Sequence, residues 1–510
     1  MGVSLRCFES LPAQANYMTL KHWALVGGAV ACLNSFSLAA APWLEPGDSR
    51  ARFAAQKLAD RGHMNRTVTT WPLMWSAVES GTHSGIKADQ RATGMAAAYL
   101  RFEQEEQAET GFRGEFSLSA QSEIPAIAGF EGPNLAKAGT NLKLQWQGDF
   151  WAMGLNPAYA HNPDDDEEFR LDGSYLAATA GNWVLGAGAI DRWWGPGWQS
   201  SLILSNNARP LPSAWVNRNS TLAPESQWLS WVGPWQFTLL AGQYESDRAV
   251  PDAKLIGMRL TFRPIDGLDI GLSRAIMFGG EGRPENASTI WNALIGKDNG
   301  QLEEEDPGNQ LGSIDVRYGF PIGQQSMGLY AQMMGEDEAG AFPGRKSWQF
   351  GTDWTTQLLG ADQQWFLEYT NTLADDLLGD ARPNITYDHS RYQTGYRHYG
   401  RNMAASFDGD AEALTLGGFH FLDNGSNVSV KATYAELNIA GANRTVTPNP
   451  DVFYTVPVNG QNVAIVDLAY GTQVLNGWLD LTLQATDKKI EYISGKKDQW
   501  AASASWTYRF

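Results

Sequence analysis

Hydrophobic and polar residues alternate without interruption along the C-terminal segment from Gln499 to Phe510. One face of this segment carries Trp500, Ala502, Ala504, Trp506, Tyr508 and Phe510, and the other carries Gln499, Ala501, Ser503, Ser505, Thr507 and Arg509. A period of two indicates a β-strand with one apolar and one polar face. A terminal strand that ends on an aromatic residue is typical of bacterial outer-membrane barrels, so this segment predicts both a fold class and a compartment.

The same alternation recurs from Gly111 onward. It is clearest at residues 142–147, 256–263, 268–273, 428–434 and 479–484. The polar face carries charged residues such as Arg259 and Arg263, which would be costly in a dry protein core. Charged side chains are natural around a water-filled lumen, so the pattern favours a membrane barrel over a soluble sandwich.

Connector lengths support this interpretation. Tight-turn signals lie at residues 148–149, 181–182, 233–234, 264–267, 321–325, 359–362, 423–427 and 476–477. Longer polar connectors alternate with them at 124–137, 162–168, 192–225, 246–252, 279–309, 336–345, 374–410, 439–462 and 489–497. Short periplasmic turns that alternate with long external loops are typical of an up-and-down barrel. We therefore predict an all-β transmembrane barrel of about 18 antiparallel strands over residues 109–510.

Residues 41–108, ahead of the predicted barrel, do not alternate. Their apolar positions predict helices at Ser49–Asp60, at Leu73–Ser80 after Pro72, and at Asp89–Gln104. We expect this region to form a small periplasmic helical bundle that caps or plugs the barrel mouth.

The N-terminus has the pattern of an export signal. An apolar run at residues 23–33 follows Lys21 and precedes small residues at 39–41. A basic flank, a short apolar core and small residues predict a cleavable signal peptide over residues 1–40. Residues 1–17 resemble an extension ahead of an internal start.

Composition narrows the range of partners. The formal net charge of −18 argues against a nucleic-acid partner, because phosphate binding needs clustered Lys and Arg. Both cysteines, Cys7 and Cys32, precede the predicted cleavage site, so the mature chain would contain no disulfide. Cys32 is also a candidate lipoprotein acceptor, although the usual Leu three residues earlier is missing.

The densest aromatic feature begins the connector after residue 190, in the sequence Asp191-Arg192-Trp193-Trp194-Gly195-Pro196-Gly197-Trp198. Tryptophan rings stack on the apolar faces of sugars, while Asp, Asn and Arg bond their hydroxyl groups. A carbohydrate site is one interpretation, and an interfacial aromatic girdle with a rigid Gly-Pro-Gly bend is the other. The candidate carbohydrate-binding residues are Trp193, Trp194, Trp198, Asp191, Arg192, Asn206, Asn207 and Arg209.

Motifs around this feature resemble a known family. The runs at residues 70–73, 171–175, 181–183 and 192–210 are similar to those of the capsule-assembly Wzi family. The resemblance implies an eighteen-stranded outer-membrane barrel with an N-terminal helical bundle on its periplasmic side. It also implies a lectin that tethers capsular polysaccharide to the cell surface without catalysis.

Three acidic runs lie in the predicted external loops, at residues 164–168, 303–306 and 336–338. Closely spaced carboxylates can hold Ca²⁺ or Mg²⁺. No run has the spacing of a defined calcium loop, so a solvated acidic surface is the preferred interpretation. We expect neither a metal site nor a cofactor.

An enzymatic alternative would use His389 as a general base with Asp388 beside it. Neighbouring residues on an extended strand point to opposite sides, so Asp388 is poorly placed to orient His389. The chain also has no G-x-S-x-G nucleophile elbow. We therefore expect a protein without enzymatic activity.

The residues and the resemblance together predict a lectin-like barrel that binds and anchors capsular or extracellular polysaccharide and assists capsule assembly. The alternative is a porin or channel for oligosaccharides, with aromatic residues along its lumen. The expected partners are the polysaccharide and outer-membrane lipid. We expect a monomer in the outer membrane of a Gram-negative bacterium, with its loops facing the exterior.

Overall fold

The structure is a computed structural model that describes residues 43–78, 90–108, 110–286, 288, 308–336, 345–375 and 381–510. The predicted signal peptide at residues 1–40 and the acidic run at 303–306 lie outside the described residues. No helix in the described part of the chain is both long and apolar enough to cross a membrane.

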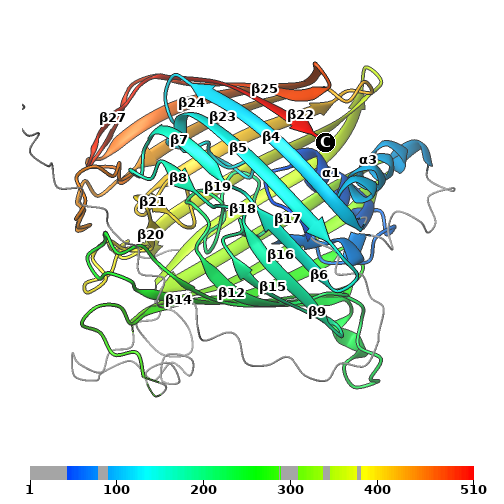
Figure 1. The fold of residues 1–510 in the computed structure, drawn as a ribbon, viewed down its shortest axis with the longest axis horizontal. Coiled ribbons are helices and arrows are strands. Elements are labelled where there is room, and N and C mark those ends of the chain that lie inside the picture. Colours follow the sequence, from blue (N-terminus) through cyan, green and yellow to red (C-terminus); the bar gives the residue numbers. More distant parts are fainter. Residues whose placement is uncertain are drawn as a thin grey trace, which may run out of the picture. The chain divides into compact units, whose positions relative to one another are not determined.

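The described strands close into one antiparallel barrel (Figure 1). Its elements are β4 (Gly111–Gln121), β5 (Ala136–Gln147), β6 (Trp151–Leu155), β7 (Ala158–Pro163), β8 (Phe169–Arg170), β9 (Tyr175–Ala180), β10 (Trp183–Gly188), β12 (Ser213–Arg218), β13 (Trp235–Gln243), β14 (Lys254–Ile265), β15 (Leu268–Phe278), β16 (Asn309–Ile322), β17 (Gln325–Glu336), β18 (Arg345–Leu358), β19 (Ala361–Asp375), β22 (Glu412–Phe421), β23 (Asn427–Leu437), β24 (Gln461–Val474), β25 (Gly477–Thr486) and β28 (Trp500–Arg509). The C-terminal strand β28 pairs with β25 on one side and with β4 on the other, which closes the barrel.

Two strands of the barrel are interrupted. Both β6 and β7 pair with β5, so they form one broken strand, and β8 and β9 form the next. Counted in this way, the described barrel has eighteen strands. The predicted fold class is confirmed.

Side-chain alternation places polar residues inside the barrel and apolar residues outside. On β14, Arg259, Thr261 and Arg263 are buried in the interior. On the outer face, exposed apolar side chains include Leu272, Ile314, Leu329, Phe350, Leu367, Leu414 and Leu468. This arrangement suits a membrane barrel, because lipid contacts only the outer face of each strand.

The segment ahead of the barrel consists of β1 (Trp43–Leu44), α1 (Ser49–Asp60), β2 (Thr70–Trp71), β3 (Leu73–Met74) and α3 (Gln90–Ala108). Helix α1 begins after Asp48, whose carboxylate accepts a hydrogen bond from a backbone N–H of the first turn at 2.8 Å. The helix lies inside the barrel, where Lys57 is 3.0 Å from Asp362 and Asp60 is 2.6 Å from Arg317. Ion pairs therefore attach this plug helix to the barrel wall.

Two predictions of secondary structure were wrong. The predicted helix at residues 73–80 begins instead as β3, because its backbone pairs with β1, and its described helical part is limited to residues 75–78. The strand expected after residue 225 lies earlier, at β12, where it pairs with β10. The connector from β12 to β13 therefore covers residues 219–234, including η2 (Ser230–Val232), and is not a tight turn.

Three segments occupy the interior of the barrel. They are residues 43–78 of the N-terminal segment, the connector at residues 189–212 and the connector at residues 381–411. In the second segment, β11 (Trp193–Trp194) pairs with β2, and Leu202 belongs to the same buried cluster as Tyr387 of the third. The remaining short strands are β20 (Arg397–His398), β21 (Arg401–Asn402), β26 (Ile490–Tyr492) and β27 (Gly495–Lys497).

Candidate functional site

The tryptophan motif that was predicted to bind sugar lies inside the barrel. The pairing of β11 with β2 aligns Trp193 with Trp71 and Trp194 with Thr70. The side chains of Trp193, Trp194 and Trp198 are each only 1% exposed. In this arrangement the three rings have no open face on which an external sugar could stack. Their direct contact with sugar stays a prediction, and their observed role is to hold the connector.

Trp198 packs between an aromatic ring and a cation. Its ring is nearly parallel to that of Phe366, with an interplanar angle of 13° and 6.0 Å between the ring centroids. The guanidinium carbon of Arg52 on α1 lies 4.2 Å from the centre of the Trp198 ring. A desolvated cation–π contact of this kind contributes about 2 kcal/mol. Trp198 thus connects the connector to both the plug helix and the barrel wall.

Glu368 on β19 fixes the backbone that follows the motif. Its carboxylate accepts hydrogen bonds from the backbone N–H of Trp198 at 2.7 Å and of Ser200 at 2.8 Å. Tyr330 and Gln349 donate to the same carboxylate at 2.9 Å and 2.8 Å. Hydrogen bonds to an ionised acceptor are roughly twice as strong as neutral ones. No local motif marks Glu368 in the sequence, although its inward position on an alternating strand is a usable signal.

The Gly-Pro-Gly bend is required by close packing. Gly195 has a φ of 155°, and a Cβ there would lie 2.8 Å from the side-chain oxygen of Gln332. A Cβ at Gly197 would lie 2.2 Å from the backbone oxygen of Ser200. Both positions therefore exclude a side chain, which explains the glycines without any ligand.

The polar residues after the motif also have structural partners. Asn206 and Asn207 are buried, and their amide nitrogens donate to main-chain carbonyls at 2.9 Å and 2.8 Å. Arg209 donates two hydrogen bonds to Asp172, at 2.7 Å and 3.0 Å, and its guanidinium carbon lies 4.4 Å from the ring centre of Tyr399. These contacts stabilise the inward fold of the connector.

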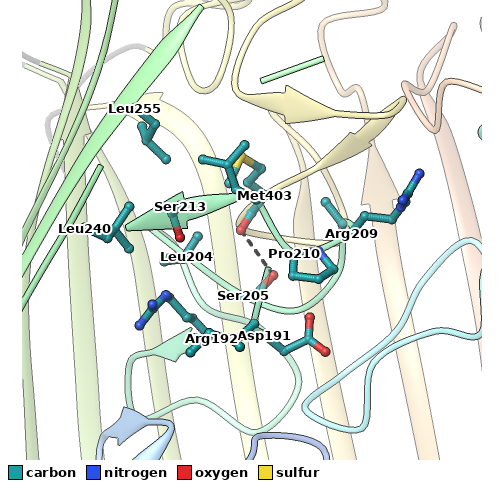
Figure 2. A pocket seen from close by; sticks show the side chains of 13 residues that line it. Asp191, Arg192, Leu204, Ser205, Arg209, Pro210, Ser213, Leu240, Leu255 and Met403 are labelled. Carbon is teal, nitrogen blue, oxygen red and sulfur yellow. Dashed lines mark hydrogen bonds between the residues drawn. The ribbon is translucent and has the colours of Figure 1, made fainter. Parts of the chain in front are cut away.

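Asp191 and Arg192 line a small cavity together with Ser205, Arg209 and Met403 (Figure 2). Its volume is about 20 Å³, which is close to the space for one water molecule and far below that of a sugar ring. Burial lowers the pKa of Arg192 to about 9, against the opposing effect of Asp191. The structure thus brings all eight predicted residues into one connector, in which Asp191 is exposed, but it does not form an open sugar pocket from them.

An exposed surface is formed by other parts of the long connectors. The backbone N–H of Val446 donates to the carbonyl of Gln393 at 2.9 Å, which joins two connectors that are distant in sequence. Asn449 donates to Asp247 of a third connector at 3.2 Å. Gln393, Val446 and Asp247 are exposed. These residues are not among the predicted ones, because no local motif marks a surface assembled from three loops.

Asp388 and His389, the residues of the enzymatic alternative, form hydrogen bonds with other residues of the connectors. Asp388 accepts hydrogen bonds from Arg397 at 2.9 Å and from Thr445 at 3.2 Å. The Nδ1 atom of His389 faces the backbone N–H of Arg391 at 3.2 Å. These contacts build the connector and do not arrange Asp388 to orient a general base.

The acidic run at residues 164–168 is partly paired with cations. Asp164 lies 2.8 Å from Lys497, and Asp165 lies 2.5 Å from Arg170. Asp165 is buried and Asp164 is half-buried, whereas Asp166, Glu167 and Glu168 are exposed. The expectation of a solvated acidic surface was therefore wrong for Asp164 and Asp165, because their carboxylates pair with Lys497 and Arg170.

The closed barrel, its apolar exterior and its occupied interior define an outer-membrane β-barrel whose own segments fill the lumen. The chain belongs to the capsule assembly protein Wzi family, since the sequence model of that family matches residues 111–502. The resemblance inferred from the motifs at residues 171–175 and 192–210 is confirmed.

Two known proteins show how far the similarity extends. The structure of Wzi from Escherichia coli, described as an outer membrane protein involved in group 1 capsule assembly and as a carbohydrate-binding β-barrel, superposes with a TM-score of 0.78. It is 26% identical in sequence, and the alignment covers 92% of this chain and 100% of that chain. An uncharacterized 55.8 kDa protein in the cps region of Klebsiella pneumoniae is 33% identical over 297 residues. That match spans about half of each chain, 56% in both cases.

Proposed function

We propose that this protein binds capsular or extracellular polysaccharide and anchors it at the surface of a Gram-negative cell, assisting capsule assembly. The observation that carries the proposal is the similarity over the whole length of the Escherichia coli barrel, which is described as carbohydrate-binding. The occupied interior supports binding over transport, because a porin needs a continuous open lumen. The protein would act without catalysis, as a monomer, with its long connectors facing outward.

The polysaccharide would contact the exposed surface of the long connectors. Gln393, Val446 and Asp247 lie on this surface and offer both polar and apolar contacts. The motif residues would support the surface from beneath, by fixing the connector at 189–212 against the connector at 381–411. This supporting set is Trp193, Trp194, Trp198, Asp191, Arg192, Asn206, Asn207 and Arg209.

The proposal is tested by measuring retention of polysaccharide on intact cells that carry variants. Trp194→Ala removes a buried ring and should reduce retention, because the connector beneath the binding surface loses its support. Trp231→Ala is the matched control, since Trp231 is 63% exposed on the connector between β12 and β13. Folded barrel in the membrane is quantified for each variant by gel mobility without heating.

A second pair of measurements separates support from contact. The double variant Gln393→Ala and Asp247→Ala should weaken binding of purified polysaccharide to the detergent-solubilised protein without changing its thermal stability. A polysaccharide site at the long connectors would be contradicted if Trp194→Ala left retention on cells unchanged and the double variant left binding of purified polysaccharide unchanged.

A further inference from the structure

A small cavity lies between the connector at residues 381–411 and the connector that follows β23. Its volume is about 10 Å³, the size of one water molecule or one ion. Polar side chains dominate its lining, namely Asn384, Asp388, Arg397, Asp408, Asp410 and Asn438. The cavity is separate from the tryptophan motif and from the polysaccharide surface proposed above.

Two buried oxygen atoms at this cavity have no hydrogen-bond partner among the described residues. They are Oδ1 of Asp410 and Oδ1 of Asn438, whose residues are 5% and 4% exposed. The second polar atom of each side chain is occupied: Asp410 Oδ2 accepts from the Asn384 backbone at 2.6 Å, and Asn438 Nδ2 donates to the Pro457 carbonyl at 2.9 Å. A buried acceptor without a partner is costly, so both oxygens call for a ligand with positive charge or a donor.

The charges around the cavity favour a cation. Arg397 forms ion pairs with Asp388 at 2.9 Å and with Asp408 at 2.8 Å. Asp410 is the third carboxylate of the lining, and its Oδ2 atom accepts a hydrogen bond from a backbone N–H. Even with the nearby Arg444 counted, three carboxylates outnumber the two guanidinium groups.

The backbone around the cavity is held in unusual conformations. Asp408, Asp410 and Asn438 have φ angles of 64°, 55° and 43°, which are uncommon for residues other than glycine. Such conformations persist where the surrounding structure requires them, and they often occur at ligand-holding loops.

We propose that this cavity binds Ca²⁺, with Asp410 Oδ1 and Asn438 Oδ1 as side-chain ligands. Calcium accepts carboxylate, amide, carbonyl and water oxygens in flexible geometry, whereas Mg²⁺ demands a near-ideal octahedron. Among the described residues no group of three Asp, Glu, His or Cys side chains is arranged to hold a metal. The site therefore includes the amide oxygen of Asn438, and the ion would join the two connectors.

Isothermal titration calorimetry with CaCl₂ tests the proposal on the full chain, purified in detergent and treated with EDTA. We expect binding of one Ca²⁺ per chain. Asp410→Asn keeps the size of the side chain but removes its charge, and it should weaken binding by at least about tenfold. Asp451→Asn is the matched control, because Asp451 is an exposed carboxylate on the same connector as Asn438.

Asn438→Asp separates a cation from a bound water molecule. The variant adds a carboxylate to the cavity, so its melting temperature should fall in EDTA and recover in Ca²⁺, with binding at least as tight as in the wild type. This variant also keeps the test decisive if Asp410→Asn does not fold. The proposal is overturned if no Ca²⁺ binds, if binding survives Asp410→Asn, or if Asn438→Asp is equally unstable with and without Ca²⁺. No polysaccharide is present, so the result is independent of the proposed function.

Discussion

Two sets of buried polar side chains in this protein differ in how completely they find ionic or hydrogen-bond partners. At the plug helix, Arg317 donates two hydrogen bonds to Asp60 and two to Asp353, at distances from 2.6 to 3.1 Å. At the long connectors, Asp410 and Asn438 each keep a buried oxygen without a partner among the described residues. Complete pairing holds a segment in one position, whereas incomplete pairing leaves room for a ligand.

The difference follows from where the residues lie. Arg317 and Asp353 occupy inward positions on β16 and β18, so the pleat of neighbouring strands presents them to α1. Asp410 and Asn438 lie just outside strands, where the backbone can adopt positive φ angles and enclose a cavity. The Arg317 pairing is thus held between a helix and two strands, whereas the unpartnered oxygen of Asp410 lies on a connector.

The largest effect is expected at the plug helix. Arg317→Met would leave Asp60 and Asp353 buried without a counter-charge, which should lower the free energy of unfolding by about 3–5 kcal/mol. Urea unfolding of the detergent-folded protein, followed by tryptophan fluorescence, measures this change. Adding Asp60→Asn and Asp353→Asn should recover part of the loss. A loss below about 1 kcal/mol for the single variant would show that this pairing does not hold the helix.

The pH dependence of stability should reveal the incompletely paired carboxylate. The pKa of Asp410 is raised from 3.8 to about 6, so the folded protein binds a proton there more tightly than the unfolded chain. Its contribution to stability is fully present below the unfolded pKa and is lost as pH rises through about 6. In EDTA, the free energy of unfolding of the wild type, relative to that of Asp410→Asn, should rise by up to about 3 kcal/mol as the pH falls from 7 to 4.

Calcium supplies the control for this measurement. At pH 7 a bound cation would offset the ionised carboxylate, so the difference between the wild type and Asp410→Asn should depend on Ca²⁺. If the difference in free energy of unfolding between the two proteins stays constant from pH 7 to pH 4 in EDTA, a raised pKa at Asp410 is contradicted.

The alternating strands allowed most of the barrel to be predicted from sequence. Period two along β14 and β28 depends on local geometry alone, and tight turns such as the one at residues 359–360 carry their own chemical signal. The strand β12 was misplaced because it is only six residues long and lies within a connector that folds inward. Its position is decided by pairing with β10, which no local pattern records.

The candidate site was harder to predict for the same physical reason. Trp198 carries a composition signal for sugar binding, but its burial results from contacts with Arg52, Phe366 and Glu368, which are far away in sequence. Residue type indicates what a side chain can do. Tertiary packing decides whether its face is open to a partner.

The smallest effect on the free energy of unfolding is expected at an exposed ion pair on the rim. Lys496 and Glu491 form an ion pair on the β26–β27 hairpin, and their side chains are 60% and 40% exposed. Solvent screens such a pair and its side chains lose entropy on pairing, so Lys496→Met should leave the urea midpoint unchanged within error. The same measurement on Arg317→Met provides the contrast. A loss at Lys496 as large as that at Arg317 would mean that burial does not decide the strength of pairing in this barrel.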